Sequence, residues 1–214
     1  PDYVFFTGDM VNSLAGEMEL FIPVLSRIRA SQGKYSILGN HDYGEDYDWA
    51  DEKEYRENLE KLIRLQNRAG FTVLRNESVQ LSLQGQTIDL LGVENWGLPP
   101  FPRYGDLDRA MAGLPADRFK ILLSHDPSHW DARVLGKTAI DLTLSGHTHG
   151  MQFAVGVGRH KWSPVKLKYP RWSGLYQEGK QALYVNIGLG FIGFPGRVGT
   201  PPEITLFELQ KRVS

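Results

Sequence analysis

Four short segments of the sequence place metal-binding side chains directly after an apolar run and a glycine or serine. They are Thr7-Gly8-Asp9, Gly39-Asn40-His41-Asp42, Ser124-His125-Asp126 and Gly146-His147-Thr148-His149, which together contain four of the six histidines. Asp, Asn and neutral imidazole are borderline-to-hard ligands that suit Mn, Fe, Zn, Co or Ni. The chain has no cysteine, which excludes a thiolate metal site, a disulfide framework and a cysteine nucleophile.

The residue types in these segments are consistent with a two-metal hydrolytic site. The carboxylate of Asp9 has two oxygens and could bridge two cations. His147 and His149, two residues apart in extended backbone, would project on one face and each serve a different ion. Two divalent ions about 3.5–4 Å apart clamp a phosphoryl group and lower the pKa of a shared water. Taken singly, Asp9 could be a helix cap, Asn40 a turn residue and His125 a core histidine.

Each segment follows a predicted strand. Apolar runs at 4–6, 34–38, 119–123 and 141–144 predict these strands, and the carboxyl ends of strands in an open α/β sheet line one crevice. Helical spacing at 17–30 and 49–69 predicts a parallel strand–helix–strand unit. Further expected elements are a hairpin of strands 78–83 and 87–93 joined at Gln84-Gly85-Gln86, a helix at 106–111, and strands at 181–187 and 203–209.

Composition limits the class of protein. The 214 residues show no internal repeat and no low-complexity linker, which predicts a single domain over residues 1–214. Lys plus Arg number 24 against 25 Asp plus Glu, so a nucleic-acid polymer is not the expected partner. No run of about 18 apolar residues is present, which argues against a membrane span in this sequence.

In order and spacing, the four segments resemble the motifs of the calcineurin-like metallophosphoesterases. The stretch from 184–190 through Pro202-Glu203-Ile204 is similar to the bacterial branch that contains YkuE and YaeI, and the resemblance covers essentially the whole chain. It implies an α/β fold with mixed sheets, arranged as a four-layer α/β/β/α sandwich. It also implies a hydrolase of phosphoesters, with phosphodiesters favoured, in which a hydroxide bridging two divalent ions attacks phosphorus. Manganese is the favoured metal.

The same resemblance implies a role for each site residue. Asp9 would bridge both ions, and His149 would bind the first ion. Asn40, His125 and His147 would complete the ligands of the second ion. The other two residues would act in catalysis rather than in metal binding: His41 would protonate the leaving oxygen, and Asp42 would hold the imidazole of His41.

One family motif is missing. The family carries Asp-x-His on a strand that precedes the Gly-Asp strand, whereas only eight residues precede Asp9. We therefore expect the domain to be N-terminally incomplete, without that strand, and the first metal site to be weak or empty. The alternative is a catalytically impaired scaffold or binding module with this fold. The expected substrate is a phosphoester, lipid- or nucleotide-linked among the options, and an upstream segment could bring membrane association. The location in a bacterial cell, cytoplasmic or membrane-associated, is not fixed by the sequence.

A few other residues bear on the function of the site or on its surroundings. Asn12 stands where purple acid phosphatases carry a metal-binding Tyr, which argues against a ferric-tyrosinate site. Arg197 could meet a substrate phosphate or form an ordinary ion pair. His129 is expected on the surface. The tryptophans at positions 96, 130, 162 and 172 could form an apolar rim, although such aromatics are more often part of a core.

Overall fold

Strand β1 (Tyr3–Phe6) contributes to two hydrophobic cores, because successive side chains of a strand point to opposite faces. In the computed structural model, which describes residues 1–83, 85–157 and 160–210, Tyr3 and Phe5 pack in one core and Val4 and Phe6 in the other. β1 pairs in parallel with β2 (Gly33–Ser36), and β2 with β3 (Phe71–Val73), forming a three-stranded sheet. The expected parallel pairing of the first two predicted strands is thereby confirmed.

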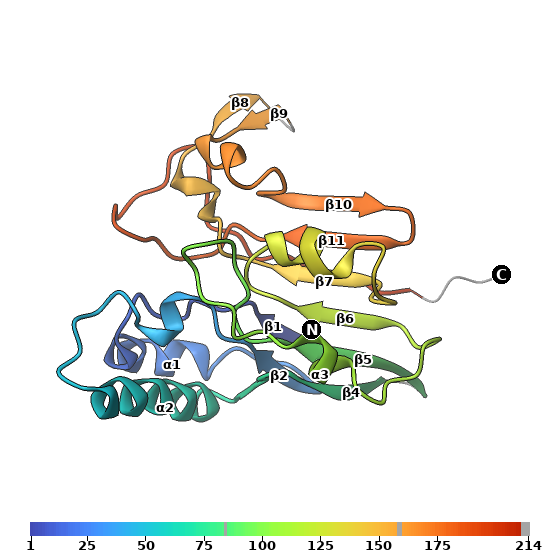
Figure 1. Cartoon of the computed structure of the whole chain (residues 1–214), viewed down its shortest axis with the longest axis horizontal. Helices are drawn as coiled ribbons and strands as arrows, with labels where there is room; N and C mark the ends of the chain where they lie inside the picture. The colour runs from blue at the N-terminus through green and yellow to red at the C-terminus, as the bar shows by residue number, and fades with distance from the viewer. Residues whose placement is uncertain (84, 158–159, 211–214) are drawn as a thin grey trace.

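A second, six-stranded sheet faces the first. Its strand order is β10-β11-β7-β6-β5-β4, in which β5, β6, β7 and β11 run parallel and the edge strands β4 and β10 are antiparallel to their neighbours (Figure 1). The bounds are β4 (Glu77–Leu83), β5 (Gln86–Gly92), β6 (Lys120–Leu123), β7 (Leu142–Ser145), β10 (Gly174–Glu178) and β11 (Gln181–Val185). A separate hairpin is formed by β8 (Val155–Val157) and β9 (His160–Trp162).

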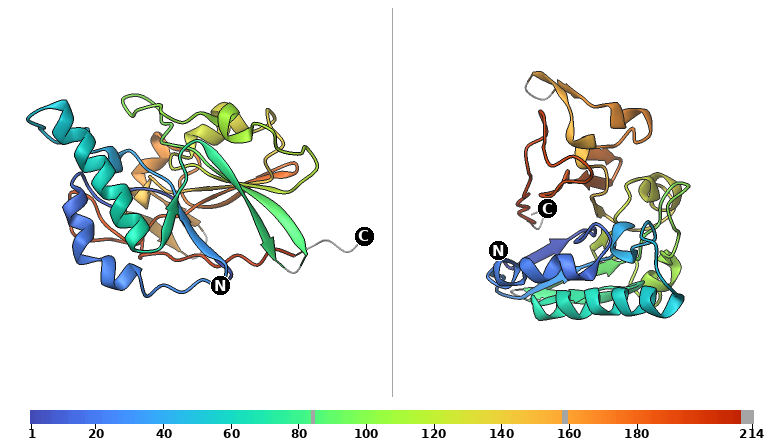
Figure 2. Two further views of the ribbon diagram at one scale, coloured as in Figure 1. Left: turned by 90° about the horizontal axis from the view of Figure 1, so that it is seen from below. Right: turned by 90° about the vertical axis from the view of Figure 1, so that its left-hand side faces the viewer.

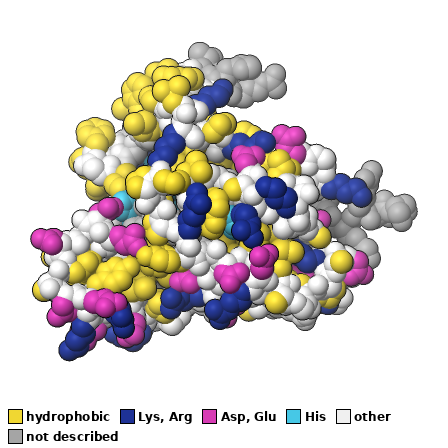
Figure 3. Space-filling view, viewed as in Figure 1, with side chains coloured by type: hydrophobic (Ala, Val, Ile, Leu, Met, Phe, Trp, Pro, Cys, Tyr) yellow, Lys and Arg dark blue, Asp and Glu magenta, His cyan; other side chains and the backbone are white. Residues whose placement is uncertain are grey.

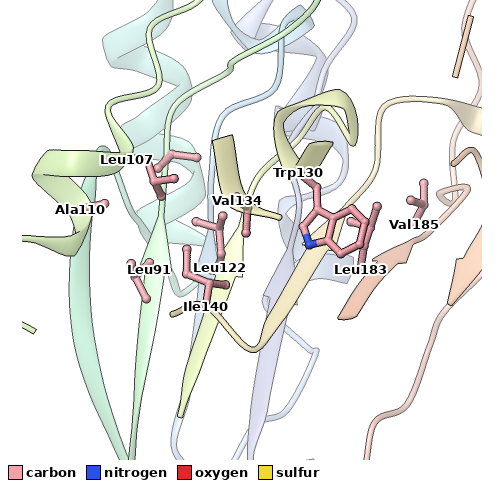
Figure 4. Packing of buried hydrophobic residues seen from close by; sticks show 10 residues of the cluster. Leu91, Leu107, Ala110, Leu122, Trp130, Val134, Ile140, Leu183 and Val185 are labelled. Carbon is pink, nitrogen blue, oxygen red and sulfur yellow. The ribbon is translucent and has the colours of Figure 1, made fainter. Parts of the chain in front are cut away.

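Helices cover the outer faces of both sheets (Figure 2). On the three-stranded sheet these are α1 (Ile22–Leu25), α2 (Glu52–Arg68) and a 3-10 helix at Ala15–Leu20; on the six-stranded sheet they are α3 (Leu107–Met111) and a π-helical turn at Trp130–Val134. Figure 4 shows the packing of Leu107, Trp130 and Val134 over Leu91 and Leu122. The core in which Tyr3 and Phe5 pack also includes Ile37, Leu90, Ile121 and Leu123 and lies between the sheets. The predicted four-layer α/β/β/α sandwich is confirmed.

Most predicted elements are present, with shifted ends. Helix 49–69 is α2, whose N-cap Asp51 accepts a hydrogen bond from the Glu54 amide at 2.8 Å. Strands 78–83 and 87–93 are β4 and β5, and residue 84 of their turn lies outside the described residues. The remaining predicted elements at 106–111, 119–123, 141–144 and 181–187 correspond to α3, β6, β7 and β11.

Two predicted elements are wrong. The continuous helix at 17–30 is replaced by the 3-10 helix and the single turn α1, with Leu20 and Val24 exposed rather than buried. Pro23 is the second residue of α1, and its ring and missing N–H prevent a helix from running through this point. Residues 203–209 form no strand; Ile204 and Leu206 are more than four-fifths exposed.

Candidate metal centre

The two sheets meet at a cluster of metal-ligating atoms. Asp9 follows β1, Asn40 follows β2, His125 follows β6 and His147 follows β7, so the carboxyl ends of four strands deliver the four residues. Ligand atoms of Asp9, His125 and His147 all lie within 4.8 Å of one another. Oδ1 of Asn40 lies 2.9 Å from Nδ1 of His147. The predicted convergence of these segments is present in the structure.

Two glycines permit this close approach. Gly8 has a φ of +93°, a region that favours glycine, and a Cβ there would lie 2.6 Å from the backbone nitrogen of Gly39. A Cβ on Gly39 would lie 2.2 Å from Oδ1 of Asp9. The loops after β1 and β2 therefore fit together only because neither residue has a side chain.

The ring orientation of His125 is fixed by a backbone carbonyl. Nδ1 lies 2.7 Å from the carbonyl oxygen of Thr7, which can only accept, so Nδ1 carries the proton. Nε2 then faces Oδ2 of Asp9 at 2.9 Å and Nδ1 of His147 at 3.3 Å. The His125 ring is thus aimed at the cluster through the nitrogen that is free to act as a ligand.

His147 is oriented by a residue that no motif indicated. Its Nε2 lies 2.8 Å from the hydroxyl oxygen of Tyr169, and that hydroxyl donates to Oδ2 of Asp126 at 3.2 Å. With its proton directed to Asp126, the Tyr169 oxygen accepts from Nε2 of His147, which leaves Nδ1 as a lone pair facing Asn40 and His125. His147 has a φ of +66°, so the extended backbone predicted for it is wrong.

These contacts leave lone pairs facing lone pairs. Oδ2 of Asp9 is buried and has no hydrogen-bond partner of acceptable geometry, despite its 2.9 Å distance to Nε2 of His125. Oδ1 of Asn40 and Nδ1 of His147 face each other in the same way. Because a group of converging acceptors needs a positive charge among them, the residues fit a divalent cation.

The electrostatics agree with a cation at this point. Burial lowers the pKa of His125, but the Asp9 carboxylate beside it raises that pKa to about 9. Burial raises the pKa of Asp9, yet His125 and the neighbouring histidines together outweigh this effect and hold the pKa far below its ordinary value. Burial and the His125 charge lower the pKa of His147 to about 4, so His147 is a neutral imidazole at pH 7. A metal ion would take the place of the proton on His125.

His149 lies outside the three-residue cluster of Asp9, His125 and His147. It also has a left-handed backbone, with a φ of +49°, rather than the predicted extended one. Its Nδ1 is buried without a hydrogen-bond partner, and burial lowers its pKa to about 4. The Asp9 carboxylate is close enough to raise the pKa of His149 in part. Nδ1 of His149 is therefore an unprotonated nitrogen near Asp9 that can act as a metal ligand.

The expected partnership between Asp42 and His41 is wrong. Oδ1 and Oδ2 of Asp42 accept from the amides of residues Asp9, Met10 and Gly39 at 2.7–2.8 Å. Nδ1 of His41 instead lies 2.9 Å from the carbonyl oxygen of Asn12. The two residues are neighbours in a 3-10 turn, where adjacent side chains point in different directions. Burial and the Asp9 charge raise the pKa of Asp42, while the amide donors act against this rise.

Other expectations are corrected or refined. His129 is buried rather than on the surface; its Nδ1 lies 2.8 Å from Oγ of Ser124, and its ring stacks on Trp96. The guanidinium of Arg197 donates to the carbonyl oxygens of residues 187, 190 and 200. Trp130 and Trp172 belong to buried cores, whereas Trp162 is 47% exposed. No tryptophan rim is therefore formed by the four together.

Comparison with known proteins agrees with this geometry. Residues 1–151 match the family model described as calcineurin-like phosphoesterase. The metallophosphoesterase YkuE of Bacillus subtilis is 36% identical over 98% of this chain and 68% of its own length. A bovine transmembrane protein with a metallophosphoesterase domain is 30% identical over 98% of this chain. A metallophosphoesterase of Campylobacter jejuni is 31% identical over the same share.

The chain spans about half the length of the bovine and Campylobacter relatives. Among solved structures, the NAD nucleotidase of Haemophilus influenzae has a TM-score of 0.48 at 17% identity, over 86% of this chain and 39% of its own. No helix in the described part of the chain is long and apolar enough to cross a membrane. From the family model and the relatives, the chain belongs to the calcineurin-like phosphoesterase family.

Proposed function

We propose that this chain hydrolyses phosphodiesters at a centre of two divalent metal ions. The observation that carries the proposal is the convergence of Oδ2 of Asp9, Oδ1 of Asn40, Nε2 of His125 and Nδ1 of His147, which offer only acceptors once a cation replaces the proton on Nε2 of His125. Such a set of oxygen and imidazole ligands suits divalent first-row metals, with manganese among them.

Five residues would hold the ions. Asn40, His125 and His147 would bind one ion, and His149 the other, with Asp9 shared between them because a carboxylate has two oxygens with several lone pairs. When bound, the ions supply Lewis-acid stabilisation of the phosphoryl oxygens and a water that is activated near neutral pH. The protein holds the ligands rigidly from the ends of strands in both sheets.

His41 would assist the leaving group. Its backbone amide donates to Oδ1 of Asp9 at 2.9 Å, which places the residue beside the cluster. Its Nδ1 donates to the carbonyl oxygen of Asn12, so Nε2 is the nitrogen available to a substrate. Protonated at Nε2, the ring would donate that proton to the departing oxygen as the bond to phosphorus breaks.

The charge of the site favours a diester over a monoester. A monoester dianion is commonly bound by guanidinium groups in bidentate geometry. Arg197 acts on His149 through its charge, but its donors are occupied by three backbone carbonyls. A diester carries a single negative charge and therefore depends less on a guanidinium group for binding.

The test compares hydrolysis of bis(p-nitrophenyl) phosphate with that of p-nitrophenyl phosphate by the full-length protein, with added manganese. We expect the diester to be the better substrate, and Asp9→Ala or His147→Ala to lower kcat/KM by about 1,000-fold or more, as loss of a metal ligand should. The matched control is Asp46→Asn, an exposed carboxylate, which should leave activity unchanged.

Bound manganese should be counted in the same samples by elemental analysis. Two ions per chain support the dinuclear centre, and one ion contradicts it. Activity that survives both ligand substitutions would overturn the hydrolase assignment. Metal binding without any diester hydrolysis would favour a scaffold with this fold.

A further inference from the structure

We propose that the loops at residues 151–155 and 191–198 form a surface that docks on an anionic lipid bilayer beside the metal centre. These loops are called the apolar loops below. Their exposed side chains are Met151, Phe153, Val155, Phe191, Phe194 and Val198, each between 41% and 64% exposed. Exposed apolar side chains that gather on one surface generally mark an interaction site.

Hydrogen bonds join the apolar loops into one surface. The amide of Ala154 donates to the carbonyl oxygen of Val198 at 2.8 Å, and the amide of Val198 donates to that of Gln152 at 2.8 Å. The Gln152 side chain donates to the carbonyl oxygens of Phe194 and Gly196 at 2.6 and 2.8 Å. The two loops therefore present their apolar side chains together rather than as scattered residues.

The charge around this surface is strongly biased. Between Gly150 and Pro202 the sequence has seven Lys and Arg and one acidic residue, Glu178, whereas the rest of the chain has 17 Lys and Arg and 24 Asp and Glu. Lys161, Lys166 and Lys168 are exposed, and Lys161 donates to the carbonyl oxygen of Gly199 at 3.3 Å, next to Val198. Figure 3 shows hydrophobic side chains gathered over the β8–β9 end of the molecule with Lys and Arg side chains beside them.

An anionic bilayer is the occupant whose chemistry matches both features. Apolar side chains on loop tips can enter the acyl boundary, and flanking lysines attract anionic headgroups. Trp162, which is 47% exposed, has the amphipathic ring that concentrates at membrane interfaces. A second exposed apolar set, at Leu20 and Phe21, lies close to Glu17, Glu19 and the Lys61–Glu19 ion pair, so it lacks the basic bias.

The surface also adjoins the metal centre. His149 begins the short 3-10 segment His149–Gln152, whose last two residues open the apolar loops. Met151 and Gln152 hold φ values of +52° and +54°, a region that non-glycine residues seldom adopt. This backbone turns the Met151 side chain out to 60% exposure directly beside the predicted ligand His149. A protein docked through the apolar loops would present its metal centre to the bilayer surface.

The test is flotation of the full-length protein with vesicles of phosphatidylcholine alone or with about a third phosphatidylglycerol, at low and high salt. We expect binding to the anionic vesicles only, weakened at high salt. Phe191→Ser with Phe194→Ser should lower the partition coefficient at least tenfold. Lys161→Glu with Lys166→Glu should lower the partition coefficient about fivefold for each lysine replaced. These variants should keep wild-type hydrolysis of a water-soluble diester, which separates this proposal from the proposed function.

The matched controls are Leu20→Ser with Phe21→Ser and, for charge, Lys53→Glu on α2; both should bind vesicles as the wild type does. Equal loss in the controls, or no binding to anionic vesicles by the wild type, would overturn the proposal. Sedimentation velocity supplies a further arm. If the wild type self-associates and the apolar substitutions abolish that association without changing vesicle binding, the surface is a contact between two copies and the proposal is wrong.

Discussion

The hydroxyl oxygen of Tyr169 lies 2.8 Å from Nε2 of His147, and its proton is directed to Oδ2 of Asp126. This contact determines which nitrogen of His147 faces Asp9 and His125. A metal-ligating histidine is usually oriented by such a partner, and loss of the partner typically costs 10–100-fold in metal affinity. Tyr169 is therefore a positioning residue for the metal centre.

Tyr169→Phe should weaken manganese binding about tenfold, since His147 loses the group that fixes its tautomer. Titration of Mn²⁺ followed by electron paramagnetic resonance measures the affinity directly. Tyr184→Phe is the matched control, because its hydroxyl also bonds side chains, those of Glu203 and Thr205, which are not predicted ligands. That variant should bind manganese as the wild type does, and an equal loss of affinity in both would contradict the positioning role.

Asp42→Asn should destabilise the protein by about 3 kcal/mol. Both oxygens of the carboxylate accept from backbone amides, whereas the NH2 group of a carboxamide cannot accept and would face an amide N–H. The carboxylate oxygens of Asp42 accept from the amides of Asp9, Met10 and Gly39. Because these bonds position the loop that carries the predicted ligand Asp9, metal affinity should fall as well. Urea unfolding in EDTA measures the free energy of unfolding of the metal-free protein. Asp48→Asn, at an exposed position, should change neither quantity. Wild-type stability in Asp42→Asn, with loss of activity alone, would instead restore the view that Asp42 acts through His41.

His41→Gln should leave stability and manganese binding close to wild type and lower kcat by about 100-fold or more for poor leaving groups. The reason is that a proton donor matters most when the departing oxygen is strongly basic. A series of aryl methyl phosphodiesters with phenols of different acidity checks this. The loss should shrink as the phenol becomes more acidic, and a loss independent of the leaving group would show that His41 does not act as the acid.

His129 should make the metal-free protein sensitive to acid. Burial and the charge of Arg133 lower its pKa from 6.5 to about 4, so the unfolded chain takes up a proton at a higher pH than the folded protein. The free energy of unfolding should therefore fall as pH drops from 6.5 to 4, by an upper bound of about 3 kcal/mol for this residue. Urea unfolding in EDTA at several pH values measures it. His129→Asn should show a shallower fall than the wild type, and parallel curves would refute the effect.

The site was predictable where strand ends impose it. Asp9, Asn40, His125 and His147 each follow an apolar strand, and parallel strands bring their carboxyl ends together regardless of separation along the chain. Tyr169 was not predictable, because it belongs to no motif and comes to His147 only through the packing of the segment after β9. The Lys168-Tyr169-Pro170 stretch carries no signal that would separate it from other aromatic positions.

The errors in the fold have a common physical origin. The apolar spacing of residues 17–30 indicates a helix, but Pro23 interrupts it, and most of the side chains of the stripe are exposed. Likewise, the spacing of His147 and His149 says nothing about φ, and both adopt the left-handed region, so their rings do not share one face of a strand. The contact of Asp42 with backbone amides depends on a loop 32 residues away.

The ligands of the proposed centre are divided between the sheets: Asp9 and Asn40 come from the three-stranded sheet, His125 and His147 from the six-stranded one. Asn40 and His147 are 107 residues apart in sequence. A metal ion held by both would act as a reversible cross-link that closes a long loop, and its effect on the chain would be largely entropic in the unfolded state. Removal of the ion should then loosen the contact between the two sheets before it disturbs either sheet, so hydrogen exchange should rise first in the loops that carry the ligands and only later within the strands.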